Sequence, residues 1–193
     1  TQLEKPWERR PEFLKLNPRG HIPILIDHQN AICEASPIAE YLDDAYQDRP
    51  LMGKDPVMRA EVRRLMHWFN EKFYGEVSVN LLEEKTIKAH LGHGAPNSSA
   101  LRAGSINLAT HLAYISYLVE RRTWLAGDRM TMADLCAAAH LSCLDYFGDV
   151  PWDKHEQAKE WYARIKSRPC FRSLLLDSIP GMIPSRHYTN LDF

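Results

Sequence analysis

The sequence lacks the features that most quickly assign a chain to a class of protein. Its 24 Lys and Arg residues nearly balance its 25 Asp and Glu residues, so the net charge is only −1 at pH 7. We therefore expect no nucleic acid or membrane as a partner. No apolar run approaches the roughly 20 residues that span a bilayer, and the opening TQLEKPWERRPEF contains no hydrophobic signal region. These absences together predict a cytoplasmic protein.

Metal motifs and disulfide frameworks are also lacking. The sequence has no CxxC pair, and its cysteine spacing fits no common metal site, so we expect small buried thiols in a reducing compartment. His90 and His93 are three residues apart without a visible third ligand, and we expect no metal there. Cys136, His140 and Cys143 share one face of an expected helix, where packing is the simpler explanation. The four cysteines are Cys33, Cys136, Cys143 and Cys170.

Residues 1–46 have the pattern of a small α/β domain. The segment TQLE is typical of the end of a strand, and residues 11–20 predict a short helix. The apolar run IPILIDH and the run after it predict two strands. A two-residue turn, Gln29-Asn30, predicts that these strands form an antiparallel hairpin. Residues 36–46 then predict a helix with Pro37 in its first turn.

Residues 47–56 predict a linker, and the residues after it predict an all-helical domain over 57–178. Asp55 is a good N-cap and Pro56 a good first residue for the first long helix. We expect a second long helix to begin at about Ala100. The tail 179–193 has two prolines and no periodicity, so we expect it to pack along the surface or to move. The first helix carries an apolar stripe at steps of three and four, formed by Met58, Val62, Leu65, Phe69 and Phe73.

The segment GDRMTMADL predicts a helix start with a capping box. Thr131 is placed as the N-cap, and Asp134 lies three residues later as its partner, although the usual acid at that place is Glu. The helix that follows is poor in charge and rich in alanine, which predicts burial on most sides. We therefore assign Thr131 and Asp134 a structural role.

Three segments in order resemble the signature motifs of the glutathione transferase superfamily. NPRGHIPIL is similar to Asn-Pro-x-Gly-x-Val-Pro-x-Leu, and CEASPIAEYL is similar to Glu-Ser-x-Ala-Ile-x-x-Tyr-Leu. WLAGDRMTMADL is similar to Leu-Ala-Gly-Asp-x-x-Thr-x-Ala-Asp. The resemblance implies a thioredoxin-like α/β domain, an all-helical domain and a homodimer. It also implies that the first βα unit of the α/β domain is missing from this chain.

The resemblance assigns a glutathione-binding role to five positions, if that function is retained. The residue matching Pro23 is cis in the superfamily, and the backbone of the preceding residue, here Ile22, pairs with the cysteinyl part of glutathione. Glu34 matches the acid that meets the ligand's ammonium group. Ala35 stands where the superfamily has a serine whose hydroxyl meets the carboxylate, and Ser36 lies one place too far along to replace it. A hydrogen bond to a charged group is worth about 1.5–3 kcal/mol, so Ala35 predicts weakened binding.

No catalytic residue is assigned. In the superfamily the Ser, Tyr or Cys that activates the thiol follows the first strand, which would lie before Thr1. Cys33 is a poor substitute because the neighbouring Glu34 raises rather than lowers a thiol pKa. The open alternatives are a transferase that joins glutathione to electrophiles, a glutathione-binding stress protein without turnover, and a protein that performs no chemistry and uses no cofactor.

Further segments, including HWFNEKFYGEV, AAAHLSCLDYFGDVPW and the terminal HYTNLDF, resemble one branch of the superfamily. This branch comprises the transferase-like cell-division proteins of alphaproteobacteria, which bind FtsZ polymers. The resemblance implies a protein that alters filament curvature, supports constriction and localises to the division site.

Two surfaces combine groups suited to such a partner. Trp and Arg are typical anchors of protein interfaces, and a basic surface would attract the acidic FtsZ polymer. The plain alternatives are packing of Trp7 and Phe13 on the sheet, solvation of the basic helices, and docking of the terminal segment onto its own domain. The first surface comprises Trp7, Arg9, Arg10, Phe13 and Leu14, with Phe193 at the tail as a further docking residue; the second comprises Arg121, Arg122, Arg164, Lys166, Arg168 and Arg172.

Overall fold

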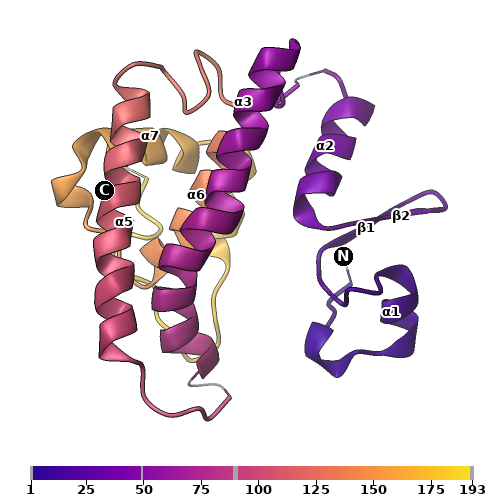
Figure 1. Ribbon diagram of the computed structural model, residues 1–193, viewed down its shortest axis with the longest axis horizontal. Helices are drawn as coiled ribbons and strands as arrows, with labels where there is room; N and C mark the ends of the chain where they lie inside the picture. The colour runs from indigo at the N-terminus through magenta and orange to yellow at the C-terminus, as the bar shows by residue number, and fades with distance from the viewer. Residues whose placement is uncertain (1, 49, 89–90, 192–193) are drawn as a thin grey trace. The chain divides into compact units, whose positions relative to one another are not determined.

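The protein was analysed as a computed structural model, which describes residues 2–48, 50–88 and 91–191. The chain divides into two compact units, Thr1–Lys54 and Asp55–Phe193. The first unit combines a β-hairpin with short helices, and the second is helical (Figure 1). No helix within the described ranges is long and apolar enough to cross a membrane.

The first unit is built around an antiparallel hairpin, as the sequence predicts. Ile24 pairs with Cys33 at one end of the hairpin, and Asp27 pairs with Asn30 at the other. The turn therefore comprises His28 and Gln29, one residue earlier than expected, and His28 adopts φ +53°. Residues 2–5 do not form the expected strand end. The elements are η1 (Pro6–Glu8), α1 (Pro11–Leu16), β1 (Ile24–Asp27), β2 (Asn30–Cys33) and α2 (Ala35–Ala45).

A buried carboxylate on α2 fixes the end of this unit. Asp43 is 8% exposed, and it accepts hydrogen bonds from the amides of Leu51 and Met52. Met52 is fully buried. Because backbone amides buried away from water need acceptors, Asp43 supplies them where the segment after α2 has no regular structure.

The second unit is a helical bundle. A long helix begins as α3 (Pro56–His67) and continues as η2 (Trp68–Ile87), whose backbone follows the π pattern; the Lys88 amide bonds the Glu83 carbonyl. This helix and α5 (Ser98–Val119) lie side by side (Figure 1). The remaining elements are α6 (Met132–Tyr146), η3 (Trp152–Lys154), α7 (Glu156–Lys166), α8 (Pro169–Arg172) and η4 (Leu174–Leu176).

The core of this unit follows the predicted apolar stripe. Val62, Leu65, Phe69 and Phe73 are all 0% exposed, and the buried face continues along η2 in steps of four residues. Gly104 on α5 faces η2, where a Cβ atom would lie 2.8 Å from Cγ of Leu81. Glycine at this place therefore lets the two helices approach closely.

Side-chain caps start the two long helices. Asp55 accepts hydrogen bonds from the amides of Val57 and Met58, as expected for its predicted N-cap role. Asn97 performs the same role for α5 by accepting from the amides of Ser99 and Ala100. α5 therefore begins at Ser98, two residues before the predicted start, because the Asn97 side chain satisfies amides that would otherwise lack acceptors.

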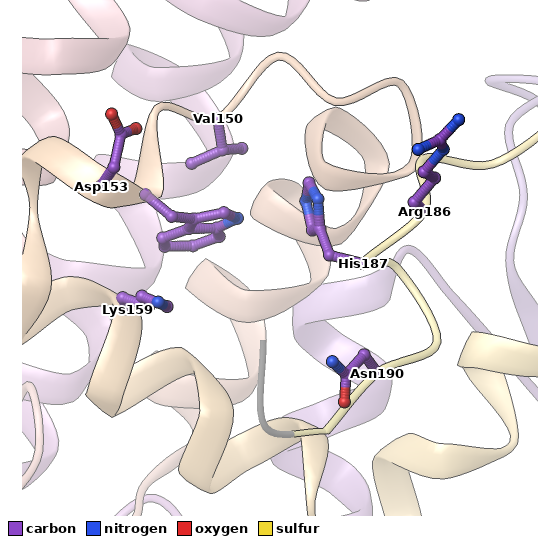
Figure 2. Close-up of a pocket in the computed structure, with 7 residues that line it drawn as sticks. Val150, Asp153, Lys159, Arg186, His187 and Asn190 are labelled. Carbon is purple, nitrogen blue, oxygen red and sulfur yellow. The ribbon is translucent and has the colours of Figure 1, made fainter.

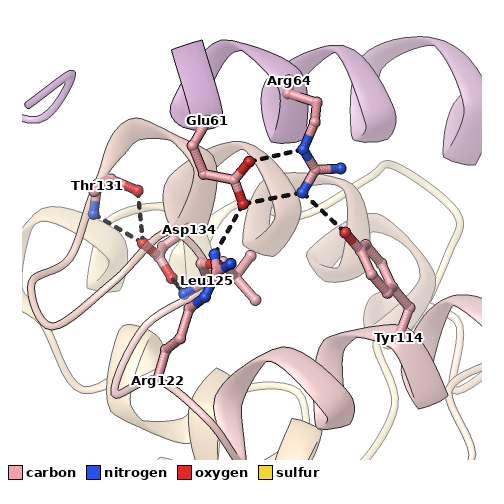
Figure 3. Close-up of polar contacts among 7 residues, drawn as sticks. All are labelled: Glu61, Arg64, Tyr114, Arg122, Leu125, Thr131 and Asp134. Carbon is pink, nitrogen blue, oxygen red and sulfur yellow. Dashed lines mark hydrogen bonds and ion pairs between the residues drawn. The ribbon is translucent and has the colours of Figure 1, made fainter. Parts of the chain in front are cut away.

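Asp134 joins three parts of the helical unit. Its Oδ2 accepts from the amide of Thr131 at 2.8 Å, and the Thr131 side chain accepts from the Asp134 amide; these two bonds form the capping box of α6. Oδ2 also accepts from the Thr131 hydroxyl at 2.9 Å. Its Oδ1 accepts from the Leu125 amide and from Nε1 of Trp161, both at 2.9 Å. The carboxylate is 0% exposed, yet four donors surround it. Figure 3 shows Asp134 between Thr131 and Leu125.

A second polar network ties α3 to α5 and to the segment after it (Figure 3). Glu61 accepts from Nε of Arg64 at 2.7 Å and from Nη1 of Arg122 at 2.8 Å. Arg64 also donates to the Tyr114 hydroxyl, and Arg122 also donates to the Leu125 carbonyl. The hydrogen bond from Arg64, with help from Arg122, lowers the pKa of Glu61 to about 2.

The C-terminal tail is anchored on α6 and α7. Lys166 and Asp145 are both 0% exposed, with Nζ and Oδ2 3.7 Å apart. Lys166 donates to the His187 carbonyl at 3.1 Å, and the His187 ring lies 2.7 Å from Oδ1 of Asp145. The Tyr188 hydroxyl lies 3.0 Å from Oγ of Ser142, and Tyr188 is 4% exposed. Residues 185–188 are therefore held against α6 and α7, and Tyr188 is buried in the core, whereas Ile179 and Ile183 earlier in the tail are 43% and 92% exposed.

Candidate functional site

The residues assigned to glutathione binding lie at the open end of the hairpin, just before β1 and just after β2. The Ile22–Pro23 peptide bond is cis, as in the matching superfamily position. The Glu34 amide donates to the Pro23 carbonyl at 3.1 Å, which brings the start of β1 next to the start of α2. Ile22 is 53% exposed, so its backbone and side chain remain accessible to a ligand.

Glu34 has an unusual backbone and an unmet acceptor. Its φ is +72°, a region that non-glycine residues rarely adopt. Its Oε1 atom is buried without a hydrogen-bond partner, and Nη1 of Arg19 lies 3.8 Å away. An acidic oxygen in this condition can accept a hydrogen bond from an ammonium group.

The start of α2 keeps its amides but lacks the hydroxyl. Glu34 occupies the N-cap position, and no side chain there accepts from the first-turn amides. Helix N-termini favour anions because these amides point outward. Ala35 is exposed and offers only a methyl group, while Ser36 is half-buried. The arrangement can still receive a carboxylate, but only through backbone groups.

The first proposed partner surface is partly accessible. Trp7 is 75% exposed, and Arg9 is exposed beside Gly20, where Leu14 also lies. Arg10 is paired with Glu4 through Nε at 3.0 Å, so its charge is offset. Phe13 is only 5% exposed, which assigns it to packing within the unit instead of direct contact with a partner. Phe193 lies outside the described residues, as does His90.

The second basic set is not one continuous surface. Lys166 is buried with Asp145, and Arg122 is bound to Glu61. Arg121 lies over the Tyr117 ring, 3.8 Å from its centroid. The expectation that Lys166 contributes to a basic partner surface is therefore wrong, and so is its solvated alternative, because Lys166 is 0% exposed.

Cys136 and His140 share a partner that the sequence did not indicate. The Cys136 thiol and Nε2 of His140 lie 3.1 and 3.0 Å from Oδ1 of Asn70. Burial raises the pKa of Cys136 to about 12 and lowers the pKa of His140. The thiol is therefore protonated and unreactive at neutral pH. Among the described residues, no group of three His, Cys, Asp or Glu could hold a metal ion.

An open pocket of about 490 Å³ lies where the tail meets α7. Figure 2 shows Asp153 and Lys159 on one side, and Arg186, His187 and Asn190 on the other. Sequence reasoning did not indicate this pocket because its two sides are far apart in the chain. It is lined by Val150, Trp152, Asp153, Lys159, Arg186, His187 and Asn190.

Comparison with known proteins agrees with the fold and motifs. The glutathione S-transferase N-terminal domain family matches residues 1–45, and the C-terminal domain family matches residues 105–169. The chain belongs to the glutathione S-transferase superfamily, which confirms the predicted fold class.

Three relatives match nearly the whole chain. FtsZ-localized protein A of Caulobacter vibrioides (strain NA1000 / CB15N) is 51% identical over 191 residues, which are 97% of this chain and 84% of the relative. A crystal structure of a glutathione S-transferase from Rhodospirillum rubrum F11 matches with a TM-score of 0.93 and 51% identity, covering 98% of this chain and 86% of that one. The structure of FzlA from C. crescentus matches with a TM-score of 0.92 and 50% identity, with the same coverage. The predicted resemblance is thereby confirmed.

Proposed function

We propose that this protein is a non-catalytic, transferase-like cell-division protein that binds FtsZ polymers, modulates filament curvature and acts at the division site. The observation that carries the proposal is the 51% identity, over 97% of the chain, to a protein named for its localisation with FtsZ. Ala35 supports it, since the superfamily hydroxyl is lost at the ligand site. The active form is a homodimer, and no cofactor takes part.

The contact surface we propose lies on η1 and α1. Trp7 is 75% exposed, and exposed Arg9, two residues later, has no carboxylate partner among the described residues. Exposed Trp and Arg side chains frequently supply most of the binding energy of an interface. Leu14 adds apolar area next to Arg9, whereas Arg10 contributes less because Glu4 holds it.

Co-sedimentation with GTP-assembled FtsZ tests the proposal. We expect the full-length protein to pellet with polymer at micromolar concentration and low salt, and Trp7→Ala with Arg9→Glu to weaken this at least tenfold. The matched control is Tyr46→Ala with Arg102→Glu, which also removes an exposed aromatic ring and reverses an exposed arginine. If the unaltered protein fails to pellet, the function is wrong. If the unaltered protein pellets and the variant with Trp7→Ala and Arg9→Glu pellets equally well, the surface is wrong.

Glutathione transfer is the second candidate function. The buried Oε1 of Glu34, which accepts no hydrogen bond from the described residues and has only the longer Arg19 ion pair, and the uncapped amides of α2 favour it. Without the serine hydroxyl, glutathione should bind about tenfold more weakly than to a complete site. Retention on immobilised glutathione, followed by conjugation of a general electrophile, tests this reading. Robust turnover by the full-length protein would refute the non-catalytic proposal.

A further inference from the structure

A second open pocket on the helical unit is lined by two arginines and by no acidic residue among the described ones. It has a volume of about 520 Å³ and lies between α7, the start of α8 and the segment that follows α5. Its residues combine two arginines with an indole and several apolar groups. It is lined by Trp124, Ala163, Arg164, Ser167, Arg168, Pro169 and Leu191.

Two guanidinium groups converge on one ring in this pocket. Cζ of Arg164 lies 4.9 Å from the centroid of Trp124, and Cζ of Arg168 lies 5.0 Å from it. Arg164 lies in the last turn of α7, and Arg168 is the N-cap residue of α8, so two like charges from successive elements share this pocket. Trp124 is only 7% exposed, so its ring provides a fixed wall for both groups.

Neither arginine has an acidic partner within the described part of the chain. Nη2 of Arg164 donates to the Thr123 carbonyl at 2.9 Å, which leaves its charge uncompensated. Nε of Arg168 is buried and has no acceptor. By contrast, Arg64 and Arg122 are both bound to Glu61. A buried donor without an acceptor is costly, so a ligand that supplies one would be favoured here.

We propose that this pocket binds an acidic side chain from a peptide segment of a partner protein. The planar guanidinium groups of Arg164 and Arg168 match the geometry of a carboxylate. The nearby Pro169 and Leu191 provide apolar contact for the residue next to that acid, which favours a peptide over a small free anion. Arg172, whose Nε donates to the Ser167 carbonyl at 3.1 Å, adds positive charge nearby. This site is on the helical unit and does not depend on FtsZ binding.

Titration with a matched pair of peptides tests the proposal. The acidic probe is acetyl-Gly-Leu-Glu-Glu-Leu-Gly-amide, and its neutral counterpart carries Gln in place of both Glu residues. Binding is followed by isothermal titration and by the indole N–H resonance of Trp124, which is assigned with a Trp124→Phe variant. We expect the acidic peptide to bind at least tenfold more tightly at low salt and to shift that resonance.

Charge-matched variants separate this pocket from general attraction. Arg164→Gln with Arg168→Gln should weaken the acidic peptide at least tenfold. Arg102→Gln with Arg129→Gln removes the same charge from two exposed arginines elsewhere and should leave affinity within twofold. Circular dichroism verifies that both proteins are folded. If both variants weaken binding equally, the pocket is not the site.

Three other outcomes would overturn the proposal. Equal binding of the acidic and neutral peptides would show that no carboxylate is recognised. Inorganic phosphate that shifts Trp124 as strongly as the peptide, at the same concentration, would indicate a simple anion site. Asp192 follows Leu191 in the sequence, so the titration is repeated with Asp192→Asn. Peptide binding that occurs only in this variant would show that the chain's own acid is the occupant.

Discussion

Asp134→Asn replaces one carboxylate oxygen with an amide nitrogen and keeps the volume of the side chain. In the native protein both oxygens of Asp134 act only as acceptors, for three backbone or indole N–H groups and one hydroxyl. An asparagine can accept on one side only, so its amide group must face a donor on the other side.

The structure indicates which orientation the asparagine adopts and what it loses. Leu125 and Trp161 present N–H groups that cannot turn away, so the asparagine oxygen should face them. The amide group then faces Thr131, whose hydroxyl can rotate to accept but whose backbone N–H is left without a partner. One unsatisfied buried donor costs about 1–3 kcal/mol, and the other hydrogen bonds lose their charge-assisted strength. We expect a total loss of about 3 kcal/mol in the free energy of unfolding.

Urea unfolding followed by far-ultraviolet circular dichroism measures this loss, and the melting temperature should fall by about 10 °C. Asp134→Ala should cost more, roughly 5 kcal/mol, because it leaves three fixed N–H donors unsatisfied. The control is Asp128→Asn, the same change at an exposed position six residues earlier, which should stay within about 0.5 kcal/mol. A loss below about 1 kcal/mol for Asp134→Asn, or equal losses at both positions, would refute the reasoning.

Three further predictions concern other contacts. The pKa of Glu61 is lowered from 4.5 to about 2 in the folded protein, so the stabilisation by its carboxylate is complete above pH 4.5 and is lost as the pH falls towards 2. The difference in unfolding free energy between the native protein and Glu61→Gln, measured by urea unfolding, should shrink over this range. A constant difference would contradict this. Asp43→Ala removes the acceptor of two amides and should speed hydrogen exchange at Met52 about tenfold, given roughly 1–2 kcal/mol of local stability. Unchanged exchange would show that the Asp43 carboxylate does not protect this amide. Because the pKa of half-buried Cys136 is raised to about 12, iodoacetamide at pH 8 should label exposed Cys170 at least a hundredfold faster, as read by peptide mass spectrometry. Comparable rates in the folded protein would count against the raised pKa.

Local features of the fold could be predicted from the sequence because short segments determine them. The cap at Asp55, the pair Thr131 and Asp134, and the antiparallel hairpin each depend on residues within a few positions of one another. The sequence predicts the turn one residue late because Asn30 favours turns, whereas in the structure Asn30 pairs with Asp27 in the hairpin. The start of α5 was placed late because the serines after Asn97 do not indicate a helix as strongly as alanine does.

Contacts between distant segments could not be predicted. Nothing in the sequence near Lys166 indicates that residues 185–188 contact it, so the sequence alone places this lysine on a basic surface. Trp124 was likewise not associated with Arg164 and Arg168, because the three meet only when α7 packs beside the end of α5. The candidate ligand site was predictable because the superfamily motifs contain all five of its residues.

The anchoring of the tail has a consequence for synthesis. Asp145 and Lys166 are made before His187 and Tyr188, which later cover them and supply a hydrogen-bond acceptor. Until the tail has emerged from the ribosome, Asp145 on α6 and Lys166 on α7 are open to water. The contacts with His187 and Tyr188 cannot yet form. A chain released before Tyr188 would therefore expose charged groups where the finished protein has a core, and a quality-control protease could distinguish the two.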